Sequence, residues 1–195
     1  MISLSSLEVF GVLSGAAGVW LAAKENILTW PVGIANNVLF CALFWRSRLY
    51  AASCLQLFYI AIAVYGWWRW SHSETGSGTQ PIRCTSRLVA WVLVLITASA
   101  WAGAYHVLCH YTNSNVPAWD SLTTVLSLTA QYMAGRKLLE NWLVWIVANT
   151  LNIGLFVFKN LYLNSCLSAF FIVMCVAGYL HWRKTQQRQS VLQAV

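Results

Sequence analysis

The chain has 195 residues, of which 59% are hydrophobic, 14% are aromatic and only 9% are charged, against roughly 25% charged residues in soluble globular domains. So few charges cannot cover the surface of a water-soluble domain, and the mean hydropathy of +0.60 excludes disordered chains, soluble nucleic-acid-binding modules and disulfide-stapled secreted domains. The formal net charge of +7 comes from basic residues that collect between apolar runs, where they indicate membrane topology.

Apolar runs of about 20 residues predict seven membrane crossings. They lie near residues 7–23, 27–45, 50–68, 88–106, 119–135, 142–158 and 162–181. One polar linker, from Ser71 to Ser86, separates the third run from the fourth. Nine Lys and Arg residues fall on the side that includes the C-terminus and three on the other side. We therefore expect a cytoplasmic C-terminus and an N-terminus outside the cell.

An internal repeat sets the expected architecture. Shifting the chain by 112 residues aligns residues 8–70 with 120–182 without a gap, and it pairs Trp, Asn, Gly and Tyr residues of the two halves. Among these pairs are Trp30 with Trp142, Asn37 with Asn149, Gly66 with Gly178, and Trp70 with Trp182. We expect an all-α integral membrane protein with seven transmembrane helices in a 3+1+3 arrangement. Because one extra helix lies between the halves, the two three-helix repeats should run parallel across the membrane.

The expected domain organisation follows from this repeat. Residues 1–70 form the first three-helix repeat. Residues 71–118 hold the linker and a connecting transmembrane helix at about 88–106. Residues 119–182 form the second repeat, and residues 183–195 form a basic, polar cytoplasmic tail. The cluster Trp67, Trp68 and Trp70 is typical of an aromatic belt at the membrane surface.

Polar side chains inside apolar spans are costly, so they are the candidate functional residues. The sixth span carries Trp142, Trp145, Asn149 and Asn152 at spacings that place them on one stripe of a helix. The second span carries Asn36, Asn37 and Phe40, the third Gln56 and Tyr59, and the fifth Gln131. Amides also join transmembrane helices by hydrogen bonding, so for Asn37 contact with a ligand and helix packing are equally good interpretations. For the sixth span, two indoles and two amides on one face favour contact with a ligand.

The central parts of the spans contain no Asp, Glu, Lys, Arg or His, which argues against a proton relay and against a charged partner for the substrate. No nucleophile with a base and no set of metal ligands can be assembled at one depth, so we expect neither an enzyme, nor a metal site, nor a cofactor. His106 and His110, spaced i and i+4, lie at the end of a span and make a poor metal site.

The motif W142-x2-W145-x3-N149-x2-N152 resembles the PnuC family of bacterial vitamin transporters, most closely its nicotinamide riboside carriers. The stretch W30-PVG-IANNVLF and the segments around L55-Q56 and Y65-GWWRW are similar to the first repeat of that family. The resemblance implies a fold like the SWEET sugar carriers, a homotrimer in the bacterial inner membrane, and facilitated diffusion by alternating access. It also implies that a cytoplasmic kinase traps the vitamin by phosphorylation, without a required complex.

The resemblance further implies which residues line the substrate site. Trp145, Asn149 and Asn152 would line it from the second half, and Asn37, Phe40, Gln56 and Tyr59 from the first; Trp142, Asn36 and Gln131 are further candidates. The pyridinium ring of nicotinamide riboside is a delocalised cation that can lie against an indole or phenol face. Thiamine, riboflavin or a deoxynucleoside are alternative substrates. A membrane receptor or assembly subunit that transports nothing is the alternative from another class.

Overall fold

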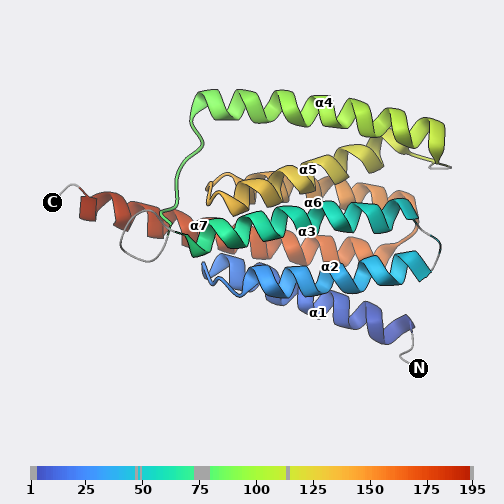
Figure 1. Ribbon diagram of the computed structural model, residues 1–195, viewed down its shortest axis with the longest axis horizontal. Coiled ribbons are helices and arrows are strands. Elements are labelled where there is room, and N and C mark those ends of the chain that lie inside the picture. Colours follow the sequence, from blue (N-terminus) through green and yellow to red (C-terminus); the bar gives the residue numbers. More distant parts are fainter. Residues whose placement is uncertain (1–3, 47, 49, 73–79, 113–114, 194–195) are drawn as a thin grey trace. The chain divides into compact units, whose positions relative to one another are not determined.

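The computed structural model describes residues 4–46, 48, 50–72, 80–112 and 115–193. Within these residues the chain forms seven helices and no strand (Figure 1). They are α1 (Leu4–Ala23), α2 (Thr29–Arg46), α3 (Tyr50–Ser71), α4 (Arg87–Tyr111), α5 (Pro117–Gly135), α6 (Asn141–Phe158) and α7 (Tyr162–Gln193). Each helix covers one of the seven apolar runs, so the prediction of an all-α chain of seven helices is confirmed.

Three helices are individually long and apolar enough to cross a membrane among the residues described: α4, α6 and α7. Helix α1 has 20 residues. Helices α2, α3 and α5 have 18, 22 and 19 residues. At 1.5 Å per residue these lengths are about 27–33 Å, which is close to the thickness of the hydrocarbon core.

The chain divides into two compact units, Met1–Pro81 and Ile82–Val195. In the first unit α2 packs against both α1 and α3. In the second unit α6 packs against both α5 and α7, and α4 packs against α5. Consecutive helices joined by short connections run antiparallel, which is the usual geometry of helical hairpins. Most of the candidate residues lie on α2 and α6, which are the helices that pack against a neighbour on each side.

The same aromatic packing recurs in both units at the offset of 112 residues. In the first unit Trp30 is buried, lies over Gly66, and meets Trp70 edge to face at 5.3 Å between ring centroids and 87° between planes. In the second unit the equivalent residues Trp142, Gly178 and Trp182 make the same arrangement, with 5.4 Å and 87°. A side chain at either glycine would overlap the indole above it. This packing joins α2 to α3 and α6 to α7.

The connections between helices also repeat. Among the residues described, four non-glycine residues have positive φ: Glu25 and Arg48 in the first unit and Lys137 and Asn160 in the second, and the two pairs again differ by 112 positions. The amides of Glu25 and Lys137 donate to the carbonyls three residues earlier, and the next amides reach back five residues. That bond pattern is a Schellman motif, which ends α1 and α5 in the same way. The aligned residues of the two halves thus adopt the same local structure.

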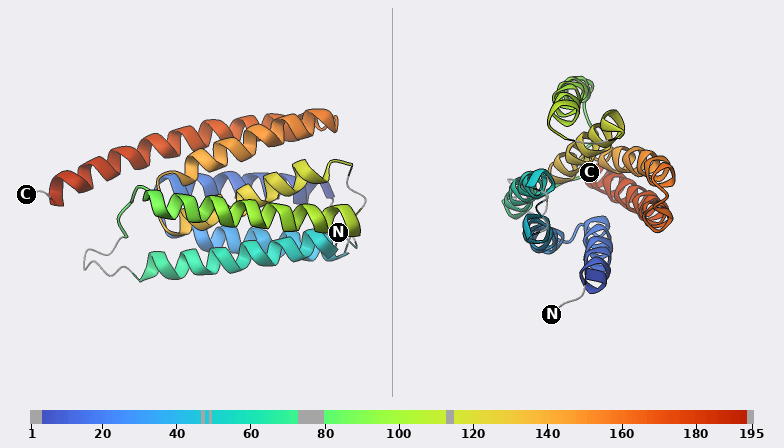
Figure 2. Two further views of the ribbon diagram at one scale, coloured as in Figure 1. Left: turned by 90° about the horizontal axis from the view of Figure 1, so that it is seen from above. Right: turned by 90° about the vertical axis from the view of Figure 1, so that its right-hand side faces the viewer.

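Two features differ from the expectations. Trp67 and Trp68 are exposed, as an aromatic belt requires, but Trp70 is buried against Trp30. Helix α7 has 32 residues and continues to Gln193, through most of the segment expected as a tail (Figure 2). This length corresponds to about 48 Å, well beyond one hydrocarbon core. The polar end of α7 therefore extends past the apolar part of the helix.

Residues 82–85 form a short strap at one end of the second unit. Arg83 pairs with Leu138 in an isolated bridge, through Arg83 N–H to the Lys137 carbonyl at 3.0 Å and Leu139 N–H to the Arg83 carbonyl at 2.9 Å. The Thr85 hydroxyl and amide both donate to Glu140, at 2.6 and 2.9 Å. These hydrogen bonds hold the segment before α4 against the α5–α6 connection. Residues 73–79 of the expected linker lie outside the described part of the chain, as do the last two residues of the tail.

Candidate functional site

Helix α6 has two distinct sides. Leu143, Val147 and Thr150 lie on the exposed side. At 3.6 residues per turn, the stripe that begins at Trp142 and ends at Asn152 lies on the opposite side. Trp142 and Asn149 are buried, and Trp145 and Asn152 are half-buried. The indoles and amides of the stripe therefore do not lie on the side of α6 that is open to the surroundings.

The four residues of the stripe have different environments. Trp142 is buried in the packing with α7 and its indole Nε1 has no hydrogen-bond partner. Asn149 is 8% exposed, and its Nδ2 donates to the Trp145 carbonyl at 2.9 Å. That bond satisfies one of the two amide hydrogens and orients the carbonyl end of the side chain. Trp145 and Asn152 are half-buried, so of the four they are the best placed to gain a partner.

Helix α5 contacts α6 from another direction. The Trp119 Nε1 of α5 donates to the Leu151 carbonyl at 3.0 Å, and the same indole lies against Gly154. Leu151 lies about 160° around α6 from Asn149. Counting back along the antiparallel hairpin from this contact places Gln131 near the first turn of α6, about 12 Å along the axis from Asn149. The contact between α5 and α6 thus does not bring Gln131, which is half-buried, to the two amides.

In the first unit the candidate residues of α2 and α3 are paired by depth. Trp30 of α2 lies over Gly66 of α3, and the two helices run antiparallel. Residues equally far from this contact, forward along α2 and backward along α3, therefore lie at the same depth. Seven positions from the contact are Asn37 and Tyr59, and ten positions from it are Phe40 and Gln56. All four are half-buried, and the structure therefore brings Asn37 to the level of Tyr59 and Phe40 to the level of Gln56.

Phe40 and Asn36 have specific surroundings. The Phe40 ring lies against Gly11 of α1, where a side chain would overlap it, and it stacks on Phe44 with 5.8 Å between centroids. Much of the Phe40 ring is thus used in packing α1 on α2. The Oδ1 of Asn36 is buried without a hydrogen-bond partner. An unpaired buried amide oxygen costs about 1–3 kcal/mol, so Asn36 is a strong candidate for contact with a ligand donor.

Two residues that were not among the candidates lie beside them. Ser168 of α7 is 5% exposed and lies at the depth of Asn152, by the same count from Trp142 and Gly178. The repeat aligns it with Gln56, so the signal was present in the sequence. Trp119 contacts Leu151 and Gly154 of α6, on the side of the helix away from Asn149. Periodicity in the sequence could not have shown this contact, because it depends on the register of α5 against α6.

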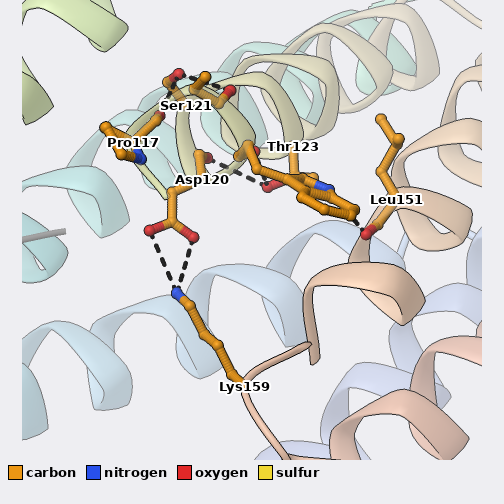
Figure 3. Close-up of polar contacts among 8 residues, drawn as sticks. Pro117, Asp120, Ser121, Thr123, Leu151 and Lys159 are labelled. Atoms are coloured by element: carbon orange, nitrogen blue, oxygen red, sulfur yellow. Dashed lines mark hydrogen bonds and ion pairs between the residues drawn. The ribbon is translucent and has the colours of Figure 1, made fainter. Parts of the chain in front are cut away.

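The charges of the second unit lie at its ends. Helix α6 has no Lys, Arg, Asp or Glu. At the start of α5, Asp120 is paired with Lys159 of the α6–α7 connection at 3.0 Å (Figure 3). At the end of α4, the rings of His106 and His110 lie 4.2 Å apart, and within the described residues they are not joined by a third residue that could complete a metal site. The amides and indoles of α6 are therefore uncharged polar groups that a molecule at mid-depth could contact.

Comparisons with known proteins show the family of the chain. The family model described as nicotinamide mononucleotide transporter matches residues 5–184. The chain is 27% identical over 187 residues to the nicotinamide riboside transporter PnuC of Escherichia coli, with 83% of this chain and 78% of the relative covered. It is 20% identical over 151 residues to the riboflavin/roseoflavin transporter RibM of Streptomyces davaonensis, with coverages of 76% and 70%.

A solved structure gives the same fold. The crystal structure of the vitamin B3 transporter PnuC superposes with a TM-score of 0.75 at 23% identity, over 95% of this chain and 83% of that one. The family match spans all seven helices, so the stripe of α6 and its counterpart in α2 belong to a multi-pass membrane transporter and not to an enzyme. The resemblance seen in the tryptophan and asparagine motif is thus confirmed, and the chain belongs to the nicotinamide mononucleotide transporter family, which includes the PnuC carriers.

Proposed function

We propose that the protein carries nicotinamide riboside across the bacterial inner membrane by facilitated diffusion. The observation that carries the proposal is the stripe of α6, where Trp145, Asn149 and Asn152 lie together on a side of the helix that is not exposed. Trp145 and Asn152 are seven positions apart, which corresponds to about 10 Å along the axis. The stripe is long enough to contact both the base and the sugar of a nucleoside.

The chemistry of the stripe suits an aromatic cation. A pyridinium ring against the face of Trp145 gains a cation–π contact of about 2 kcal/mol when water is excluded. The amides of Asn149 and Asn152 offer both donors and acceptors, which match a carboxamide and ribose hydroxyls. Asn36, Asn37, Phe40, Gln56 and Tyr59 are the proposed substrate-binding residues of the first unit. Trp142 and Gln131 are the least supported residues of the proposed set.

Nicotinamide riboside fits this chain better than nicotinamide mononucleotide, although the matched family model carries the latter name. The two molecules differ by a phosphate group, which carries a charge of about −1.5 to −2 at neutral pH. Burying such a charge without a cation is costly. Helix α6 has no basic residue, and the basic residues of α2 and α3 are Arg46 and Arg69, in their last turns. The neutral sugar end of the riboside requires no such partner.

Riboflavin is the second candidate, because the chain is also similar to a riboflavin transporter. A flavin ring can stack on Trp145, and its ribityl hydroxyls can bind amides. It carries no positive charge, so it would gain less from the indole face than the pyridinium does. Thiamine, another aromatic cation, stays a candidate on chemistry alone.

The remaining parts of the proposal follow from the resemblance to PnuC carriers and from the distribution of charge. The protein works as a homotrimer with a cytoplasmic C-terminus, and its two three-helix repeats, on either side of the connecting helix, face the same way and alternate access by rocking. A cytoplasmic kinase that phosphorylates the vitamin supplies the direction. The lack of charged residues in α6 supports transport without proton coupling, since a proton relay requires ionisable groups.

Isothermal titration calorimetry on the purified protein tests the substrate. We expect nicotinamide riboside to bind, and nicotinamide mononucleotide, riboflavin and thiamine to bind at least tenfold more weakly. Tighter binding of riboflavin or thiamine would replace the substrate and keep the carrier. Binding without uptake into proteoliposomes would instead favour a receptor that does not transport.

A further inference from the structure

The first turn of α5 is tied to other helices by consecutive residues. The carbonyl of Ala118 accepts a hydrogen bond from Trp101 Nε1 of α4 at 3.1 Å. Trp119 Nε1 donates to the Leu151 carbonyl of α6 at 3.0 Å. The next residue forms the ion pair with the α6–α7 connection, drawn with the Leu151 bond in Figure 3. This turn therefore fixes the position of α5 relative to α4, α6 and the start of α7.

Trp119 holds α6 in two ways. Its Nε1–H donates to the carbonyl of Leu151, the residue directly before Asn152. Its ring occupies the space that a side chain at position 154 would take. A Cβ on Gly154 would lie 2.8 Å from the Cζ2 of Trp119, too close for a real contact. The indole thus contacts α6 on neighbouring turns, behind the stripe and close to its amides in depth. It resists both rotation of α6 and sliding along its axis.

The two halves of the chain differ at this contact in a coordinated way. Where the second repeat has Trp119 and Gly154, the first repeat has Leu7 and Ala42. A larger residue on one helix is thus accompanied by a smaller residue on the other. The Trp119–Gly154 pair therefore occurs in the second half alone, beside the helix that carries Asn149 and Asn152.

We propose that Trp119 is a positioning residue for the substrate site, and that it sets the rotation and depth of Asn149 and Asn152. This inference rests on the proposed function of the stripe. An amide group lies about 6 Å from the helix axis, so a rotation of about 10° moves it by about 1 Å. Binding groups must be held within about 0.5 Å and 10–20° to act together. Small movements of α6 are therefore enough to weaken binding.

The test replaces the indole by a smaller aromatic ring. Trp119→Phe removes the N–H together with the indole atoms Cζ2 and Cη2 that lie against Gly154. We expect the Kd for nicotinamide riboside to rise by about three- to tenfold, with little change in the melting temperature. The matched control is Trp101→Phe, which removes the other indole-to-carbonyl bond of the same turn but does not touch α6. It should leave the Kd unchanged.

A second measurement does not depend on the ligand. Hydrogen–deuterium exchange in the segment 145–155 of α6 should speed up in Trp119→Phe and stay as in wild type in Trp101→Phe. Wild-type affinity in Trp119→Phe, or an equal loss in both variants, would overturn the inference. If the wild-type protein binds no nicotinamide riboside, the proposed function fails. Unchanged exchange in Trp119→Phe would then refute the inference separately.

Discussion

Replacing Gly178 by alanine tests the aromatic packing that joins α6 to α7. The added Cβ would lie 2.7 Å from the Cη2 and Cζ2 atoms of Trp142, whereas carbon atoms in contact prefer about 3.5–4.0 Å. About 1 Å must therefore be absorbed. Trp142 is 3% exposed and its ring already meets Trp182 edge to face, so the indole has no free space into which it can move.

The size of the effect follows from two opposing terms. Overpacking of this kind costs about 1–3 kcal/mol, and a rigid indole between two helices belongs at the upper end. Alanine regains about 1 kcal/mol over glycine in a helix. The net loss of about 2 kcal/mol corresponds to a melting temperature lower by about 4–8 °C for a chain of this size.

Melting followed by intrinsic tryptophan fluorescence, on protein purified in detergent, measures the effect. The control is Gly103→Ala in α4, where, apart from neighbouring atoms of the same helix, no heavy atom of the described residues lies within 4 Å of the new Cβ. We expect this control to melt at the wild-type temperature or above it. A Gly178→Ala protein that is as stable as Gly103→Ala would refute the packing at this position and its repeat at Gly66.

Three further predictions concern the site and the charges. Asn149→Ala should weaken binding of nicotinamide riboside at least tenfold in calorimetry, because it removes hydrogen bonds inside a site shielded from water; Thr150→Ala, on the exposed side of the same helix, should bind as wild type. Lys159→Met should lower the melting temperature by less than about 3 °C, since its ion pair with Asp120 is partly exposed and such pairs contribute about 0.2–1 kcal/mol; a larger loss would mean that the pair is more than a surface contact. Uptake should be the same with or without a proton or sodium gradient, and strict dependence on either would rule out the uncoupled mechanism.

The helices could be predicted closely from the sequence because each is an apolar run of membrane length. Helix α6 begins and ends within one residue of the run 142–158. The run is ended by charged or polar residues that also end the helix. The extension of α7 to Gln193 could not be predicted in this way, because its last part is polar and carries no apolar signal. The polar segment is recognised as part of α7 only from the helix that it forms in the structure.

The site was partly predictable for a related reason. Helical spacing alone places Asn149 and Asn152 on one side of α6, and the structure leaves that side away from the exposed residues. The contacts between helices were beyond such reasoning. Phe40 packs on Gly11, and Trp119 packs on Gly154. Both contacts depend on the register between neighbouring helices, which the spacing of residues within one helix does not specify.

Uptake of radiolabelled nicotinamide riboside into proteoliposomes, with wild type compared against Trp145→Ala, tests most directly whether the stripe of α6 recognises the cation. We predict uptake down the concentration gradient by the wild type, and at least a tenfold slower initial rate in Trp145→Ala at subsaturating substrate. Equal rates for the two proteins would contradict the account, because transport would then proceed without the indole face that is proposed to bind the pyridinium ring.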